Sequence, residues 1–376
     1  MDPLIAEQVA RLAGHVPAEL EALVAISSPS GDHEGAEAAV ALCIALLPDG
    51  WTTERVPCST DGFAPDLIAR LQGTGERRLM LLGHLDTVIS HEAHVPLSRR
   101  DGKLHGPGTA DMKGGDALAL AVAKALSTTP DRFAELAILF VCDEEWRTRP
   151  FHHVPRFAGY DACLCFEAGE RAPQGGEGVI VRRKGAGTLR VRAAGRASHS
   201  GSAPQDGRNA LLALSRAAIQ IGELSDPTGP DQLTVVPTIM HAGGAFNVVP
   251  AAGELVFDMR SRDTESFERV RDAVPEELDE VQLSAALERV WPAMHSEAAV
   301  TDLLQRASQR LGRPIVPRAR GGASDASHFA ATIPLTVDGL GPRGGGAHTP
   351  EEFVHEATLR ERLEVALAVA LSALEA

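Results

Sequence analysis

Short apolar runs that alternate with helical segments fill the first half of the chain. Residues 79–82, 137–141 and 162–166 are continuous apolar runs, as expected for strands that are buried on both faces. Residues 18–26 follow helical spacing, and residues 111–126 begin with an acid and are rich in Ala and Leu, so we expect helices there. Strands that alternate with helices predict an α/β domain with a mostly parallel central sheet.

The pattern changes at about Gly187. Residues 188–193 alternate apolar and polar side chains, which is typical of a sheet with one face in water. Strands are also predicted over residues 233–240 and 254–260, and a helix over residues 209–224. We expect the buried stripe of this helix to consist of Leu211, Leu214, Ala218 and Ile221, and the buried side of the last strand to consist of Leu255, Phe257 and Met259.

After about Trp291 the α/β pattern returns and ends in a helix with regularly spaced leucines, namely Leu359, Leu363, Leu367, Leu371 and Leu374. At 376 residues the chain also exceeds the length at which a single core usually keeps growing. We therefore predict a discontinuous α/β domain of residues 1–184 and 291–376, into which an α+β segment of residues 185–290 is inserted.

The charge and composition exclude several classes of partner. The formal net charge of −15 would repel phosphate backbones and anionic membranes, and aromatic residues make up only 4% of the chain. The five cysteines form no CxxC pattern, no secretory signal is visible, and no apolar stretch approaches the length of a membrane span. We expect a cytoplasmic protein that binds neither nucleic acid nor membranes.

Polar side chains stand at or just beyond the ends of the predicted strands, where α/β proteins place their ligands. Two others lie in a Gly-rich loop and near the end of the chain. The set consists of His84, Asp86, Asp111, Asp143, Glu144, Glu145, Glu167 and His348. Carboxylates and imidazoles are ligands that zinc uses, so the sequence predicts a metal site.

Single members of this set also have ordinary structural interpretations. Asp111 could cap the helix that follows it, and Glu144-Glu145 could be a solvated acidic turn. Glu167 is different because it ends an apolar run, and a buried carboxylate needs a partner or a metal.

The order of the motifs closely resembles the co-catalytic zinc peptidases of the M20 family, which includes glutamate carboxypeptidase, acetylornithine deacetylase, succinyl-diaminopimelate desuccinylase and aminoacylase. The resemblance covers nearly the whole chain and is greatest to the glutamate carboxypeptidase branch. The matching motifs are Gly83-His84-Leu85-Asp86-Thr87-Val88, the segment 106–115, Asp143-Glu144-Glu145, Ala197-Ser198-His199-Ser200-Gly201, Asn247-Val248-Val249-Pro250 and Gly321-Gly322-Ala323-Ser324-Asp325-Ala326.

This resemblance implies a hydrolase with two zinc ions per subunit, for which cobalt is a possible substitute. His84 and Glu167 would hold one ion, Glu145 and His348 the other, and Asp111 would bridge both. The family often has a cis peptide bond after the bridging aspartate, which here is Asp111-Met112.

The resemblance also implies the other catalytic roles. Glu144 would be the general base, and Asp86 would accept the second N–H of His84 and fix its tautomer. His199, on the inserted lid domain, would reach the active site of a partner subunit and stabilise the oxyanion. A homodimer through the inserted domain follows from that role.

Asn247, Arg260 and Gly322 are the expected substrate contacts. Arg260 could bind a free substrate carboxylate through two parallel hydrogen bonds, although a surface ion pair with Asp258 or Asp263 is the alternative.

Two departures from the family leave the substrate open. Trp146-Arg147-Thr148-Arg149-Pro150 stands where many relatives have Gly and Ser, and Trp291 lies where the glutamate carboxypeptidase branch suggests a basic side chain. The leading hypothesis is a dizinc hydrolase of peptidyl or N-acyl amino acids with a free carboxylate. The alternatives are an N-acyl-amino-acid deacylase, a one-metal hydrolase and a non-catalytic binding relative.

Overall fold

The computed structural model describes residues 1–375 and divides them into two compact units. Unit 1 comprises Met1–Arg182, His295–Ala319 and the chain from Ser324 onward. Unit 2 comprises Arg183–Met294 and the short segment Arg320–Ala323. The chain thus leaves unit 1 after Arg182, forms most of unit 2 in one continuous stretch, and returns at His295 before it adds the short segment Arg320–Ala323 to unit 2.

The central sheet of unit 1 has the strand order β1-β2-β6-β3-β7-β17. β3 runs parallel to β6 and β7, and β7 runs parallel to β17, whereas β2 pairs antiparallel with both β1 and β6. The bounds are β1 Thr52–Val56, β2 Asp66–Gln72, β3 Arg78–His84, β6 Glu135–Val141, β7 Ala162–Cys165 and β17 Leu335–Val337. The predicted α/β class is confirmed, with a parallel centre and an antiparallel edge.

The helices of unit 1 cover this sheet. α4 and α9 pack against β3 and against each other, and α8 contacts β7 and β17. The bounds are α1 Pro3–Leu12, α2 Val16–Val24, α3 His33–Leu46, α4 Lys113–Leu126, α7 Glu297–Leu311, α8 Ala326–Phe329 and α9 Glu356–Leu374. The five leucines of the predicted C-terminal helix are all buried in α9. Residues 79–82 of β3 are all buried too, as expected for a strand that is covered on both faces.

α4 begins at Lys113, later than the predicted start at residue 111, and Met112 is its N-cap residue. The Asp111-Met112 peptide bond is cis. The Asp111 side chain does not cap the helix but faces two histidines. The cis bond lies at the position that the family resemblance implies.

Smaller elements complete unit 1 and its connections. One small sheet has the order β18-β19-β5-β4, and another has the order β15-β9-β16, with β8 paired to β9. The strand bounds are β4 Ser98–Arg100, β5 Lys103–His105, β8 Glu170–Arg171, β9 Glu177–Arg183, β15 Met294–His295, β16 Ile315–Arg320, β18 Gly344–Gly345 and β19 Phe353–His355. Short 3₁₀ helices lie at His91–Ala93, Pro130–Arg132 and Val154–Phe157 in unit 1, and a fourth lies at Pro204–Asp206 in unit 2.

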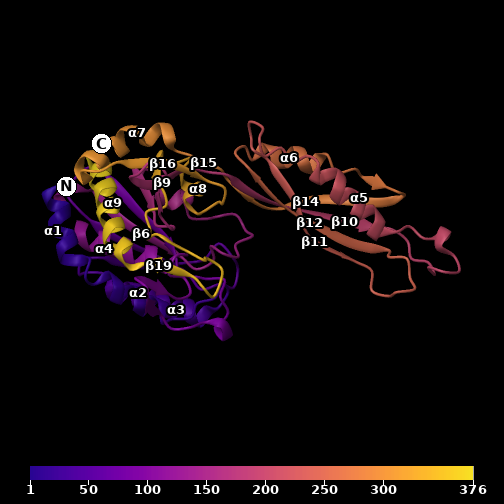
Figure 1. Ribbon diagram of the computed structural model, residues 1–376, viewed down its shortest axis with the longest axis horizontal. Helices are drawn as coiled ribbons and strands as arrows, with labels where there is room; N and C mark the ends of the chain where they lie inside the picture. The colour runs from indigo at the N-terminus through magenta and orange to yellow at the C-terminus, as the bar shows by residue number, and fades with distance from the viewer. Residues whose placement is uncertain (376) are drawn as a thin grey trace. The chain divides into compact units, whose positions relative to one another are not determined.

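Unit 2 is an antiparallel sheet of order β11-β12-β10-β14-β13 with two helices packed on it (Figure 1). The bounds are β10 Gly185–Ala194, α5 Ala210–Gly222, β11 Thr234–Ala242, β12 Ala252–Ser261, α6 Glu265–Asp272, β13 Glu277–Leu278 and β14 Val281–Trp291. Leu255, Phe257 and Met259 are buried in a separate core with residues of both helices, as predicted. Arg190, on the opposite face of β10, pairs with Glu254 and Glu288, so this face is polar.

The predicted buried stripe of α5 is wrong in part. Leu214 and Ile221 are buried, but Leu211 is exposed and Ala218 is only partly buried. The remaining buried positions are the alanines Ala210, Ala213 and Ala217. Small side chains let the helix lie close to the sheet, and the larger Leu211 turns outward.

None of the helices within residues 1–375 is long and apolar enough to span a membrane.

Candidate metal centre

The carboxyl ends of β3, β6 and β7 bring the first group of polar side chains together. His84 is the last residue of β3 and pairs in register with Val141, the last residue of β6. Glu144 and Glu145 follow β6, and Glu167 follows β7. Because these strands are adjacent and parallel, their ends meet at one edge of the sheet.

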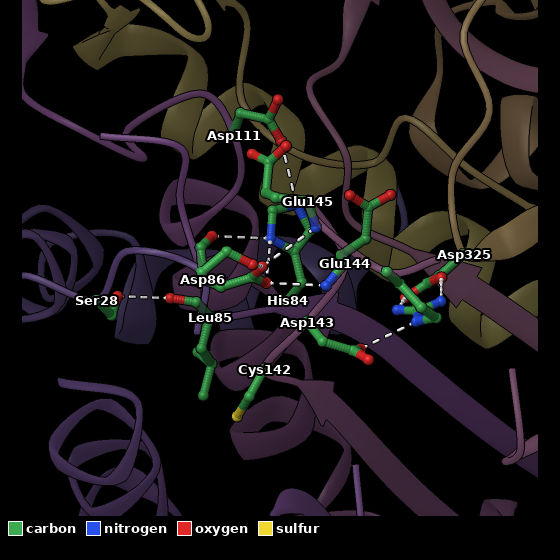
Figure 2. A network of polar contacts seen from close by, with 12 residues as sticks. Ser28, His84, Leu85, Asp86, Asp111, Cys142, Asp143, Glu144, Glu145 and Asp325 are labelled. Atoms are coloured by element: carbon green, nitrogen blue, oxygen red, sulfur yellow. Dashed lines mark hydrogen bonds and ion pairs between the residues drawn. The ribbon is translucent and has the colours of Figure 1, made fainter. Parts of the chain in front are cut away.

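Asp111 lies between two histidines in this cluster. Figure 2 shows Asp111 beside His84. Its Oδ1 atom is 3.1 Å from Nε2 of His84, and its Oδ2 atom is 3.1 Å from Nε2 of His348. His84 Nε2 also lies 3.8 Å from Glu167 Oε1, and His348 Nε2 lies 3.2 Å from Glu145 Oε2. All five predicted ligands therefore come together, with Asp111 shared and one glutamate beside each histidine.

The two histidines differ in their surroundings. The His84 side chain is 2% exposed, whereas that of His348 is 54% exposed, on the loop between β18 and β19. Hydrogen bonds to Asp111 and Glu145 raise the pKa of His348 to about 10. Burial by itself lowers the pKa of His84, but hydrogen bonds to Asp111 and Asp86 outweigh it and raise the pKa well above its usual value. The neighbouring carboxylates thus favour the protonated form of both imidazoles.

The residues present fit a metal centre. Ligand atoms of His84, Asp111 and Glu145 lie within 4.8 Å of one another. Glu145 Oε1 is buried and accepts no hydrogen bond from the residues at positions 1–375. A buried, unpaired carboxylate oxygen is destabilising unless a cation or donor meets it. Carboxylates and imidazoles at this spacing are suitable ligands for zinc, which would displace the histidine protons.

Asp86 holds the backbone of the turn after β6. Its Oδ1 and Oδ2 atoms accept hydrogen bonds of 3.1 Å from the backbone N–H groups of Glu144 and Glu145, and Oδ2 accepts one of 2.5 Å from Ser30 Oγ. His84 Nδ1 lies 3.1 Å from the backbone carbonyl of Asp86 and 3.4 Å from its carboxylate. The carbonyl is thus the nearer acceptor for His84, and the carboxylate orients the turn.

Glu144 lies beside this cluster with its carboxylate unengaged (Figure 2). Its side chain makes no hydrogen bond with the part of the chain that the structure describes. Loss of solvation raises its pKa well above the usual value, and the charge of His84 opposes that rise. A carboxylate with raised proton affinity and no competing donor is suited to proton transfer.

Sequence reasoning missed Glu352. This buried carboxylate accepts hydrogen bonds from the backbone N–H groups of Gly108, Ala110 and Asp111, at 2.9, 2.7 and 2.9 Å. Burial raises the pKa of Glu352 to about 7, and the three N–H groups oppose the rise. The only signal in the sequence is that Glu352 follows His348 by four residues.

The remaining predicted residues lie in unit 2. His199 is exposed, and its Nδ1 atom accepts hydrogen bonds from the backbone N–H groups of Gly201 and Ser202. Asn247 neighbours it, since the Asn247 carbonyl accepts from the Ser200 N–H at 3.0 Å.

The other two predicted substrate contacts of unit 2 are Arg260 and Gly322. Arg260 binds Asp258 through Nε and Nη2, both at 3.0 Å, which is the ion pair considered as the alternative. The Gly322 carbonyl accepts from Arg183 at 2.9 Å.

A second group of potential ligand atoms lies in unit 1, at Cys58, Asp66 and Asp143. Asp66 already pairs with His153 Nε2 at 2.7 Å, and Asp143 accepts from Arg147 Nε at 3.0 Å. The cationic Arg147 next to this group disfavours a metal ion, so we assign the group a structural role.

Parallel strands that deliver carboxylates and imidazoles to one edge, with an unengaged glutamate beside them, define the chain as a metal-dependent hydrolase. The sequence profile of Peptidase family M20/M25/M40 matches residues 80–372, and the chain belongs to this family. It is 29% identical over 365 residues to carboxypeptidase G2 of Pseudomonas sp. (strain RS-16), covering 92% of this chain and 86% of that protein. It is 30% identical over 373 residues to the succinyl-diaminopimelate desuccinylase of Rhodospirillum rubrum, and the match covers 90% of this chain and 94% of that protein.

Solved structures of low identity share the fold. A tripeptidase from Staphylococcus aureus matches with a TM-score of 0.79 and 19% identity, covering 97% of this chain and 99% of the other. A dinuclear metal binding peptidase of the M20 family from Bacillus subtilis matches with a TM-score of 0.74 and 16% identity, and the match covers 97% of this chain and 99% of the other. The predicted family and fold class are thus confirmed.

Proposed function

We propose that this protein is a dizinc hydrolase that cleaves the amide or peptide bond of a peptidyl or N-acyl amino acid with a free carboxylate, like a glutamate carboxypeptidase. The main support is the arrangement around Asp111, which faces His84 on one side and His348 on the other. His84 and Glu167 would hold one zinc, Glu145 and His348 the second, and Asp111 both; cobalt could replace zinc.

The side chains divide the chemistry between them. Bound zinc would polarise the scissile carbonyl and lower the pKa of a water molecule. Glu144 would accept a proton from the attacking water and donate it to the leaving amine, because its carboxylate has no hydrogen-bond partner among residues 1–375 and its pKa is raised by burial. Asp86 keeps Glu144 in place through the backbone N–H groups of Glu144 and Glu145.

Residues of unit 2 would bind the substrate. Nδ1 of His199 accepts two backbone hydrogen bonds, so the proton of the neutral imidazole lies on Nε2, from which it can be donated to a developing oxyanion. Arg260 would bind the substrate carboxylate by releasing Asp258, with Asn247 and Gly322 as further contacts.

We further propose that unit 2 is the lid and forms a homodimer. β11 is an edge strand of its sheet, with Val236 and Ile239 exposed. The neighbouring α5 exposes Leu212 and Ile219, at 54% and 66%. An unpaired strand edge beside exposed apolar side chains favours pairing with a second copy by two-fold symmetry.

The partners and the location stay predictions. The substrate is the only partner besides a second copy that we propose; the charge of −15 disfavours nucleic acid and anionic membranes. A cytoplasmic location agrees with the five free thiols of Cys43, Cys58, Cys142, Cys163 and Cys165.

An N-acyl-amino-acid deacylase is the second candidate, because desuccinylases are among the relatives at 30% identity. Pteroyl-glutamates, dipeptides, N-succinyl and N-acetyl amino acids should be assayed side by side. Turnover of acylated amino acids alone would replace the carboxypeptidase proposal with the deacylase.

Substitution of the general base tests the mechanism. Glu144→Gln keeps the shape of the side chain but cannot accept the proton, so we expect kcat to fall about 10²–10⁴-fold. Zinc measured by elemental analysis should remain near two ions per chain. Full activity of this variant would refute the mechanism, whereas one zinc per active chain would favour a one-metal hydrolase.

Mixing two inactive variants tests the role of His199 across the dimer. Glu144→Gln and His199→Asn, unfolded and refolded together, should recover part of the activity, because hybrid dimers contain one site with both residues intact. Ile219→Glu should weaken the dimer in analytical ultracentrifugation and reduce turnover. Recovery in the mixture is not expected if His199 acts within its own chain.

A further inference from the structure

Arg147 is among the largest completely buried side chains of the protein. It follows Glu145-Trp146, in the turn where the sequence departs from the Gly and Ser of many relatives. Its Nε atom donates to Asp143 at 3.0 Å, and Nη1 and Nη2 donate to the two oxygens of Asp325 at 2.5 and 2.9 Å. One guanidinium group therefore joins two carboxylates that are 182 positions apart in sequence, from 143 to 325.

The environment fixes the orientation of this guanidinium. Its centre lies 4.4 Å from the centre of the Phe151 ring, which covers one of its faces. Burial by itself would raise the pKa of Asp325, but the charge and hydrogen bonds of Arg147 lower it below its usual value. A bidentate pair between two buried charges has little freedom to rearrange, because neither charge can be left unpaired.

Each carboxylate of this triad belongs to a separate part of unit 1. Asp143 immediately precedes Glu144 and also accepts from the backbone N–H and hydroxyl of Thr60, at 3.0 and 2.7 Å. Asp325 immediately precedes α8, which contacts β7 and β17, and its neighbour Ser324 donates to Asp338 at 2.6 Å. Arg147 thus connects the turn that carries Glu144 to the β17 side of the central sheet.

Asp86 also binds this turn, through the backbone of the turn and not through one of its side chains. It binds the N–H groups of Glu144 and Glu145, while Arg147 binds the side chain of Asp143. The carboxylate of Glu144 itself has no hydrogen-bond partner among residues 1–375, so its position depends on the backbone of the turn. The hydrogen bonds of Asp86 and of Arg147 together restrict the backbone on both sides of Glu144.

We propose that Arg147 is a positioning residue for the general base: by pairing with Asp143 and Asp325 it holds the Glu144 turn in the geometry needed for proton transfer. The inference rests on the proposed function, since it assigns to Arg147 the orientation of Glu144. Loss of Arg147 should therefore affect the chemical step more than substrate binding or metal content.

The test compares Arg147→Met and Arg147→Lys with the wild-type enzyme at saturating zinc. A displacement of the base by about 1 Å can reduce turnover about 10²-fold, so we expect that loss of kcat for Arg147→Met and a smaller one for Arg147→Lys, which keeps the charge. KM should stay within about three-fold and zinc content should not change. A kcat within about three-fold of wild type for Arg147→Met, or a loss that follows zinc content, would overturn the proposal.

Controls separate this role from general stability and from the proposed function. Arg310→Met removes another ion pair of unit 1, to Asp2 at 2.5 Å, and should lower the melting temperature while keeping kcat. If Arg147→Met does not fold, Asp325→Asn keeps the side-chain shape and should reduce kcat about ten-fold; wild-type kcat in that variant would overturn the role of Arg147. An active Glu144→Gln, measured in parallel, would instead refute the proposed function.

Discussion

Glu352 accepts three backbone hydrogen bonds from the loop that carries Asp111. Its Oε1 atom accepts from the backbone N–H groups of Ala110 and Asp111, and its Oε2 atom accepts from the backbone N–H group of Gly108. The amide of Glu352→Gln offers only one acceptor oxygen, so at least one buried N–H group would face another donor. We expect zinc affinity to fall about 10–100-fold, as for other residues that orient a metal ligand, with a lower melting temperature of the zinc-loaded protein.

Glu351 provides a matched control for this prediction. Its side chain is exposed, and Glu351→Gln makes the same chemical change one position away. Zinc titration and thermal melting of the two variants should therefore differ. Equal zinc affinities would mean that Glu352 does not position Asp111.

At the level of elements, α4 approaches the end of β7 so closely that a side chain does not fit between them. A Cβ atom at Gly115 would lie 1.9 Å from the carbonyl oxygen of Phe166, the residue before Glu167. Gly83, next to His84, is similarly restricted, since its Cβ atom would lie 2.1 Å from Asp116 Oδ1. The glycines of the two motifs thus allow the helix and strand ends to meet at the site.

Gly115→Ala should displace Phe166 and with it Glu167. Because a backbone atom cannot move as easily as the end of a side chain, we expect a loss of stability of about 1–3 kcal/mol or more. Zinc content should fall from about two ions to about one per chain, as the ligand pair of His84 and Glu167 is disturbed. Gly14→Ala, whose Cβ atom would meet nothing within 4 Å, is the control and should keep both ions.

At the level of the whole molecule, the chain has two separate hydrophobic cores. One contains residues of α4, α9 and the central sheet, and the other contains residues of α5, α6 and the sheet of unit 2. All five proposed zinc ligands belong to unit 1. Zinc binding should therefore stabilise unit 1 directly, and unit 2 only through its connections.

Calorimetry with and without a chelator tests this expectation. We expect two thermal transitions, of which one moves to lower temperature when zinc is removed. At a free zinc concentration of about 100 times the dissociation constant, the stabilisation amounts to about 2.7 kcal/mol. His348→Ala should reduce the shift. If the midpoints of both transitions shift together, or if neither shifts, the assignment of zinc binding to unit 1 is contradicted.

Local sequence pattern is enough to predict the strand ends and the residues placed there. His84, Glu144 and Glu167 follow apolar runs, and parallel strands bring such positions to one edge, so their neighbourhood follows from local pattern and one rule of topology. The prediction that Leu211 is buried is wrong, because burial on α5 depends on the fit of a side chain against the sheet and not on its apolar size alone.

The distant residues that support that edge can be identified only from the folded chain. Glu352 binds the loop of Asp111 across more than 240 positions, and Arg147 binds Asp325 across 178. A charged residue far away in sequence has no local pattern that distinguishes it from a solvated one. Its burial, and the need to pair a charge once it is buried, arise only when the chain has folded.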